Sequence, residues 1–127
     1  MAMVHGIKVA AVNTSCSDPA ALARFYAALL GMEVTTEEPG WVVINAPDAV
    51  PLSFELDEHF QPPVWPSEPG LPPAQLHLDV QVDDLEGAVS HALECGARLA
   101  DFQPQDDVRV CLDPEGHPFC LFLDDPA

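Results

Sequence analysis

The chain contains the same sequence unit twice. Residues 50–58 read VPLSFELDE, and residues 117–125 read HPFCLFLDD. Further upstream, the segment DPAALARFYAALLG at 18–31 aligns with DDLEGAVSHALECG at 83–96, and each segment ends in a glycine before a β-prone run. A unit used twice predicts two similar halves that face each other, with a cleft for a ligand between them.

The first half has the pattern of a strand, a helix and three further strands. Residues 7–14 are β-prone, Asp18 suits the N-cap of a helix, and Pro19 suits its first position. Apolar residues then follow at helical spacing until Gly31, a typical residue for a helix end. Three more strands are predicted near 32–37, 40–46 and 51–57.

The second half repeats this order. Residues 75–82 alternate between polar and apolar side chains, which predicts a strand that is buried on one face. Either Asp83 or Asp84 caps the helix that follows, and Gly96 ends it. Further strands are predicted near 98–102, 107–112 and 117–123, with DPEG at 113–116 as a tight turn.

Between the halves lies a segment rich in proline. Six prolines between residues 58 and 74 exclude a regular helix or a central strand. We interpret 58–74 as a linker anchored by Trp65. The expected fold is therefore α+β: a single domain over 1–127, with one βαβββ module at 7–57 and a second at 75–123.

The charge balance excludes some classes of partner. Four Lys and Arg residues against 21 Asp and Glu residues give a formal net charge of −17. Such a chain is repelled by nucleic acid and by anionic membrane surfaces, so we expect neither as a partner. The acidity is interpreted either as a solubility feature or as a preference for a cationic ligand.

The expected location is the cytoplasm. No apolar run approaches the roughly 18 residues of a membrane span, and the N-terminus lacks the pattern of a signal peptide. The four cysteines show no CxxC spacing, which favours reduced thiols.

Several motifs together resemble one known superfamily. The helix of the first half carries Asp18, Phe25-Tyr26 and Leu30-Gly31, and the second half contains HLDVQVDDL at 77–85, CGARL at 95–99 and DPEGHPFCLFL at 113–123. On these residues, and on FELDEHFQPPVWP at 54–66, the chain resembles the vicinal oxygen chelate (glyoxalase, bleomycin resistance and dioxygenase) superfamily, closest to its glyoxalase-like subgroup. The resemblance implies paired βαβββ modules around a cavity.

The resemblance also implies where a metal would bind. Metal-dependent members take ligands from the first and last strands of each module, and the metal acts as a Lewis acid. These positions map to His77 and Cys120 in the second module, and to Ala11 and Ser53 in the first, with Glu55 two residues beyond Ser53. Because the set is incomplete, we expect no tightly bound ion, with a divalent metal on His77 and Glu55 as the alternative.

Two residues are the candidate catalytic groups. His77 lies on the polar face of its strand, where it is either a cavity residue or a hydrogen-bonded structural histidine. Glu55 is either a ligand, base or anchor for a cationic group, or an exposed strand carboxylate.

The other candidates are assigned to ligand binding. Ser53 and Asp79 share strand faces with Glu55 and His77. Trp65, or alternatively Trp41, is expected to line the mouth of the cavity.

Two further candidates have a structural alternative. Cys120 is either a packing residue or, with His77, a zinc ligand. Arg109 would grip a ligand carboxylate, or pair with Asp106 or Asp107.

The expected function is the binding of a small organic molecule. The alternative is a metal-dependent lyase, isomerase or dioxygenase that uses His77, Glu55 and Cys120, so catalysis itself is left open. A third possibility is an interaction protein with a vestigial cavity. A homodimer is expected because open sheet edges favour pairing.

Overall fold

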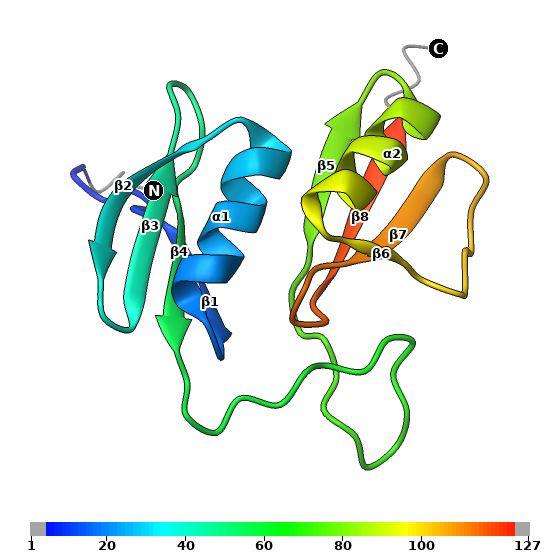
Figure 1. Ribbon diagram of the computed structural model, residues 1–127, viewed down its shortest axis with the longest axis horizontal. Coiled ribbons are helices and arrows are strands. Elements are labelled where there is room, and N and C mark those ends of the chain that lie inside the picture. Colours follow the sequence, from blue (N-terminus) through cyan, green and yellow to red (C-terminus); the bar gives the residue numbers. More distant parts are fainter. Residues whose placement is uncertain (1–4, 124–127) are drawn as a thin grey trace. The chain divides into compact units, whose positions relative to one another are not determined.

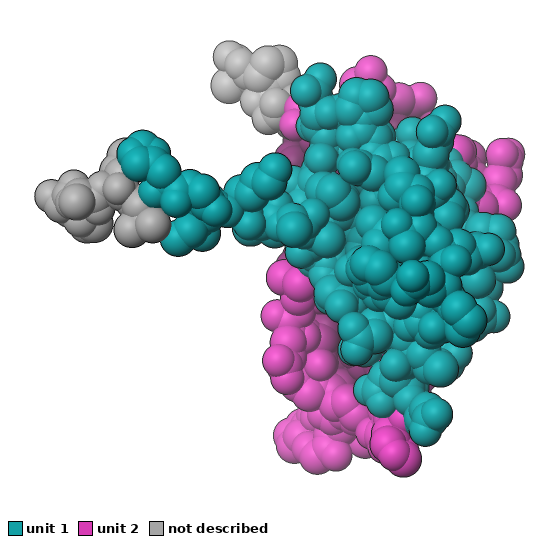
Figure 2. All heavy atoms as spheres, turned by 90° about the vertical axis from the view of Figure 1, so that its left-hand side faces the viewer, with its two compact units in different colours: residues 1–58 teal, residues 59–127 magenta. Residues whose placement is uncertain are grey.

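The computed structural model of the protein describes residues 5–123. The chain divides into two compact units, Met1–Glu58 and His59–Ala127 (Figure 2). The expectation about a signal peptide rests partly on residues 1–4, which lie outside the described range. Within that range, neither helix combines the length and the apolar character that spanning a membrane requires.

Unit 1 is a four-stranded sheet with one helix on one of its faces (Figure 1). Its elements are β1 (Val12–Cys16), α1 (Pro19–Leu30), β2 (Glu33–Glu38), β3 (Trp41–Asn45) and β4 (Leu52–Leu56). The strand order is β1-β4-β3-β2, with β1 parallel to β4 and the other neighbours antiparallel.

The ends of α1 follow from its flanking residues. The Asp18 carboxylate accepts a hydrogen bond of 3.2 Å from the backbone N–H of Ala21, and Pro19 begins the helix, as predicted. Gly31 ends it in the left-handed conformation, with φ of 69°, and donates its N–H to the carbonyl of Ala27.

Aromatic packing joins α1 to its sheet. Phe25 and Tyr26 are buried on the helix, and the Tyr26 ring stacks on Phe54 of β4 with ring centroids 5.6 Å apart. Leu52 and Phe54 therefore point to the side of α1. Ser53 and Glu55, which alternate with them, point to the opposite face of the sheet.

Unit 2 repeats this architecture. Its elements are β5 (Leu78–Val82), α2 (Leu85–Cys95), β6 (Arg98–Leu99), β7 (Val108–Leu112) and β8 (Pro118–Leu123), in the sheet order β5-β8-β7-β6. The α+β fold of two βαβββ modules is thus confirmed. The cap of α2 is Asp84, whose carboxylate accepts a 3.1 Å hydrogen bond from the N–H of Gly87.

The repeat extends to the strand register. In unit 1, Asn13 pairs with Ser53 across the parallel strands β1 and β4. In unit 2, Asp79 pairs with Cys120 across β5 and β8. The sequence alignment of Ser53 with Cys120 therefore corresponds to an equivalence in the two sheets.

Two strands begin later than the sequence predicts. β1 starts at Val12, not at residue 7, and β5 starts at Leu78, not at residue 75. The start of each strand is limited by the strand with which it pairs: β4 for β1, and β8 for β5. β4 follows Pro51 and β8 begins at Pro118, and proline has no N–H with which to extend the hydrogen-bonded ladder. Residues 5–10 are exposed, and Figure 2 shows the first described stretch of unit 1 standing away from the body of that unit.

The proline-rich segment forms a closed loop within unit 2 (Figure 1). The N–H of Val64 donates to the carbonyl of Pro72 at 2.7 Å, which ties the two ends of the loop together. Trp65 stacks on Phe102, with ring centroids 5.8 Å apart.

The DPEG turn is organised by the carboxylate of Asp113, which is fully buried. Its Oδ1 accepts the backbone N–H groups of Glu115 at 2.9 Å and His117 at 3.1 Å. The His117 ring lies 2.8 Å from its other oxygen. The carboxylate thus fixes the connection from β7 to β8, and with it the position of Cys120.

Candidate functional site

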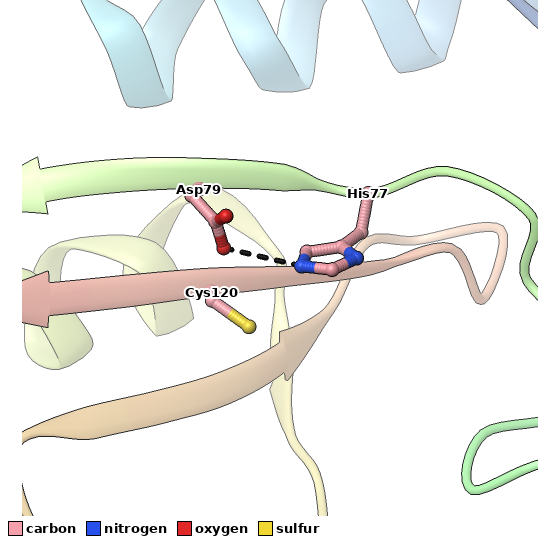
Figure 3. A group of neighbouring side chains, drawn as sticks. All are labelled: His77, Asp79 and Cys120. Carbon is pink, nitrogen blue, oxygen red and sulfur yellow. Dashed lines mark hydrogen bonds and ion pairs between the residues drawn. The ribbon is translucent and has the colours of Figure 1, made fainter.

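Three chemically reactive side chains lie together in unit 2. The ligand atoms of His77, Asp79 and Cys120 all lie within 4.8 Å of one another (Figure 3). Within this group, Nε2 of His77 is 3.1 Å from Oδ1 of Asp79. An imidazole, a carboxylate and a thiol thus meet at one place, which we call the unit 2 cluster.

Strand register produces this grouping. Phe119 and Leu121 on β8 are buried, with 0% and 1% exposure, on the side of the sheet that packs against α2. Cys120 lies between them in sequence and therefore points to the opposite face. Its register partner Asp79 points the same way, as does His77, two residues before Asp79.

The cluster is accessible from solvent. The side chains of His77 and Asp79 are 48% and 63% exposed, whereas Cys120 is half-buried. Burial raises the pKa of the Cys120 thiol, and the charge and hydrogen bond of Asp79 raise that pKa further. The thiol is therefore protonated at neutral pH when no metal is bound.

The donor set of the cluster fits a divalent metal such as Zn²⁺. Zinc is bound by thiolate, imidazole and carboxylate ligands, and a catalytic site uses three protein ligands with a fourth position open. Bonds of roughly 2.0–2.3 Å in a tetrahedral site place ligand atoms about 3.5 Å apart. The distances within the cluster, 3.1 Å for one pair and up to 4.8 Å for the others, bracket this value.

The equivalent positions in unit 1 carry different chemistry. The residue that corresponds to His77 is Ala11, which has no donor atom, and the residue that corresponds to Asp79 is Asn13. Ser53, the counterpart of Cys120, is 3% exposed. Unit 1 therefore lacks, at these positions, the thiolate, imidazole and carboxylate that a transition metal prefers.

Glu55 lies in unit 1 opposite an aromatic residue on the neighbouring strand. Its Oε1 accepts a 2.9 Å hydrogen bond from Nδ2 of Asn13. Trp41 is the register partner of Glu55 on the neighbouring strand and is 38% exposed. Directly paired residues share one face of a sheet with Cβ atoms about 4.5–5.5 Å apart, so Glu55 and Trp41 lie on the same face, with the Glu55 carboxylate directed toward Asn13 on β1.

Arg109 has contacts with its own backbone neighbourhood. Its Nη1 donates to the carbonyls of Asp106 and Val108, both at 2.9 Å. Arg109 pairs with Leu121, so it lies on the α2 side of the sheet, whereas Cys120 lies on the other side. The binding of a ligand carboxylate by Arg109 stays a prediction.

The predicted site residues thus form two groups. Ser53 and Glu55 share one face in unit 1, and His77, Asp79 and Cys120 share one face in unit 2. Because the groups belong to separate units, the prediction of a joint metal site on His77 and Glu55 stays a prediction. Trp65, assigned to ligand binding, lies against Phe102 of unit 2.

Sequence reasoning missed the role of Asn13. The signal was present, because Asn13 precedes the helix cap Asp18 by the same five residues that separate Asp79 from Asp84. The strand-face alternation had already placed His77 and Asp79 together. The sequence also offered Cys120 with His77 as zinc ligands, but it did not bring Asp79 into the same group.

The comparison with family models decides the identity of the fold family. The model described as a glyoxalase-like domain matches residues 11–122. The chain belongs to the glyoxalase-like family. The wider superfamily suggested by the sequence is therefore confirmed, and the match spans both units of this glyoxalase-like protein.

Solved structures of similar fold include enzymes and binding proteins. A glyoxalase/bleomycin resistance protein/dioxygenase family enzyme from Burkholderia phytofirmans has a TM-score of 0.71 at 18% identity, covering 92% of this chain and 98% of its own. TnmS3, an antibiotic binding protein from a Streptomyces species, has a TM-score of 0.62 at 21% identity, covering 97% and 100%.

A third similar structure is the fosfomycin resistance protein FosX from Mesorhizobium loti, with a TM-score of 0.66 at 12% identity, covering 98% of this chain and 96% of its own. The comparison with functionally curated proteins found no match. At these identities the likeness establishes the fold of the glyoxalase-like protein and leaves its ligand to be inferred from its own residues.

Proposed function

We propose that this glyoxalase-like protein binds a small organic molecule that carries a cationic group. The family match over residues 11–122 supports a small-molecule function. One of the similar structures is TnmS3, an antibiotic binding protein from a Streptomyces species.

The observation that carries the proposal is the pairing of Glu55 with Trp41 on one sheet face of unit 1. A cation over an indole ring gains about 0.5–2 kcal/mol, depending on how far it is desolvated. The Glu55 carboxylate on the same sheet face supplies the opposite charge. Asn13, which donates to Glu55, is neutral and leaves the negative charge uncompensated.

The composition of the chain supports the same ligand class. With a net charge of −17, the protein attracts cations over a range set by the ionic strength. The surface charge raises the rate of encounter, whereas Glu55 and Trp41 provide the specific contacts.

The test compares two substitutions against a matched control. Glu55→Gln and Trp41→Leu should each weaken binding of an aromatic ammonium compound by roughly fivefold to tenfold, as loss of a contact of about 1 kcal/mol requires. Glu37→Gln, which removes an equal charge from the exposed strand β2, should have little effect. Equal losses in Glu37→Gln and Glu55→Gln would assign the effect to net charge and refute the site.

A second candidate function is favoured by the unit 2 cluster. His77, Asp79 and Cys120 could hold a divalent metal for a lyase, isomerase or dioxygenase reaction, in which the bound metal would act as a Lewis acid. The experiment is to measure the metal content and the activity of protein purified without chelator. Loss of both metal and activity in His77→Ala would support this function over simple ligand binding.

We also propose that the protein works in the cytoplasm. Cys16, Cys95, Cys111 and Cys120, all within the described residues, are not joined in disulfide bonds, and reduced thiols persist in reducing compartments. Mass tagging of thiols in intact cells should count four reduced cysteines per chain, and a disulfide between any two of them would contradict the assignment.

A further inference from the structure

The geometry points to a zinc site built from unit 2 alone, with His77, Asp79 and Cys120 as its three protein ligands. The donor atoms come from His77 just before β5, from Asp79 on β5 and from Cys120 on β8, and β5 and β8 are paired in register. The inference goes beyond ligand binding on unit 1, and it holds whether or not the bound metal is catalytic.

The donor set selects the class of metal. Thiolate and imidazole ligands suit Zn²⁺ and exclude Mg²⁺ and Ca²⁺, which take oxygen ligands. The three ligand atoms lie within 4.8 Å of one another, and one pair is already 3.1 Å apart. Small side-chain rotations are therefore sufficient to reach zinc distances of roughly 2.0–2.3 Å.

The backbone holds two of the ligands in place. Cys120 lies on β8, an inner strand of the sheet that pairs with β5 on one side and β7 on the other. Asp79 is fixed opposite Cys120 by the parallel register. The thiol and the carboxylate are therefore held on one rigid sheet face, and only the His77 side chain, just before β5, has to orient for metal binding.

This arrangement differs from the division of ligands that the resemblance implies. Ligands drawn from both modules would require donors at Ala11 and Ser53, and these side chains are a methyl group and a buried hydroxyl. Asp79 lies outside the family positions and completes the set within unit 2. Glu55 of unit 1 is consequently dispensable for the metal.

The chain contains a competing thiol–imidazole pair that serves as a control. Nε2 of His91 lies 3.9 Å from Sγ of Cys95, one helical turn apart on α2. Among the described residues, three possible metal ligands come together in the unit 2 cluster, whereas no third possible ligand lies beside His91 and Cys95. A pair of this kind binds metal more weakly than a set of three.

The experiment is a titration of the full chain, freed of metal by a chelator, with Co²⁺ and then Zn²⁺. Cobalt bound to a thiolate gives a sulfur-to-metal charge-transfer band, and displacement of Co²⁺ by Zn²⁺ reports zinc affinity. We expect one equivalent of Co²⁺ with a charge-transfer band that disappears in Cys120→Ser. Asp79→Asn and His77→Ala should weaken zinc binding by more than about 100-fold, because even outer-shell partners of a metal are worth 10–100-fold.

Two controls separate this site from its rivals. Cys95→Ser should keep the band, and Glu55→Gln should keep both the band and the zinc affinity. Circular dichroism of each metal-free variant shows whether it is folded. Because Asp79 is exposed, we expect Asp79→Asn to fold, and this variant provides the test if Cys120→Ser does not fold.

Each of the other outcomes would overturn the proposal. A band that is lost in Cys95→Ser would place the metal on α2. A loss of affinity in Glu55→Gln would show a site shared between the units. No saturable cobalt binding, or equal binding in Asp79→Asn, would leave His77 and Asp79 as a hydrogen-bonded surface pair.

Discussion

Asp113 shows how one buried side chain can organise a strand connection. Its carboxylate has no exposed surface and accepts the backbone N–H groups of Glu115 and His117. A buried N–H without an acceptor costs roughly 1–3 kcal/mol. The carboxylate therefore contributes to stability through the turn as well as through its contact with the His117 ring.

We predict that Asp113→Ala lowers the free energy of unfolding by about 2–4 kcal/mol, because two backbone donors lose their acceptor. Urea denaturation measures the change. The matched control is Asp101→Ala, at an exposed position, with an expected change within about 0.5 kcal/mol. Similar effects of the two substitutions would contradict this account of the turn.

Cys111 gives a prediction about pH. Burial raises the pKa of its thiol from 9.0 to about 11, with a smaller contribution from Cys120. Between these two values the folded chain keeps a proton that the unfolded chain has released. The contribution of this thiol to stability is therefore complete below pH 9 and is lost as the pH rises toward 11.

The measurement compares the wild type with Cys111→Ala by urea denaturation from pH 8 to pH 11. The alanine variant lacks the titrating group, so the stability difference between the two proteins should shift against the wild type as the pH rises through this range. A difference that stays constant up to pH 11 would show that the folded and unfolded thiols titrate alike.

At the scale of elements, the start of α2 distinguishes between two neighbouring carboxylates. The sequence allowed Asp83 or Asp84 as the N-cap, and the structure gives the cap to Asp84. We predict that Asp84→Ala costs about 1 kcal/mol of stability, because the N–H of Gly87 loses its acceptor. Asp83→Ala is the matched control, and thermal denaturation of the two variants should rank Asp84→Ala as the less stable.

The sequence predicted the elements well where local rules determine them. The cap at Asp18, a cap at either Asp83 or Asp84, and the turn at 113–116 follow from side-chain chemistry within a few residues. Strand ends were less accurate, since the start of β1 at Val12 depends on where β4 begins, about 40 residues later. The meeting of Cys120 with Asp79 depends on the same kind of long-range register.

At the scale of the whole molecule, the assembly state remains a prediction. We expect a homodimer, because the terminal strand β2 of unit 1 presents an edge with Val34 40% exposed, and open edges favour pairing. The charge of −17 opposes association but is screened over about 8 Å at physiological salt. Light scattering at micromolar concentration should give twice the chain mass, and a monomer mass would refute the prediction.

The repeat explains why the fold was more predictable than the function. Two copies of one pattern constrain the order and register of both sheets, so an error in one half is exposed by the other. The chemistry depends on where the copies differ: Asn13 against Asp79, Ser53 against Cys120, and Ala11 against His77. Such differences identify polar positions without naming the molecule that they contact.

The most direct test of the proposed function is a calorimetric titration with one aromatic scaffold carrying either an ammonium or a carboxylate group. We predict that the ammonium compound binds more tightly, and that its advantage shrinks as salt is raised from about 10 mM to about 150 mM, where the screening length falls from roughly 30 Å to 8 Å. Equal affinities, or tighter binding of the carboxylate compound, would contradict recognition of a cation at Glu55 and Trp41.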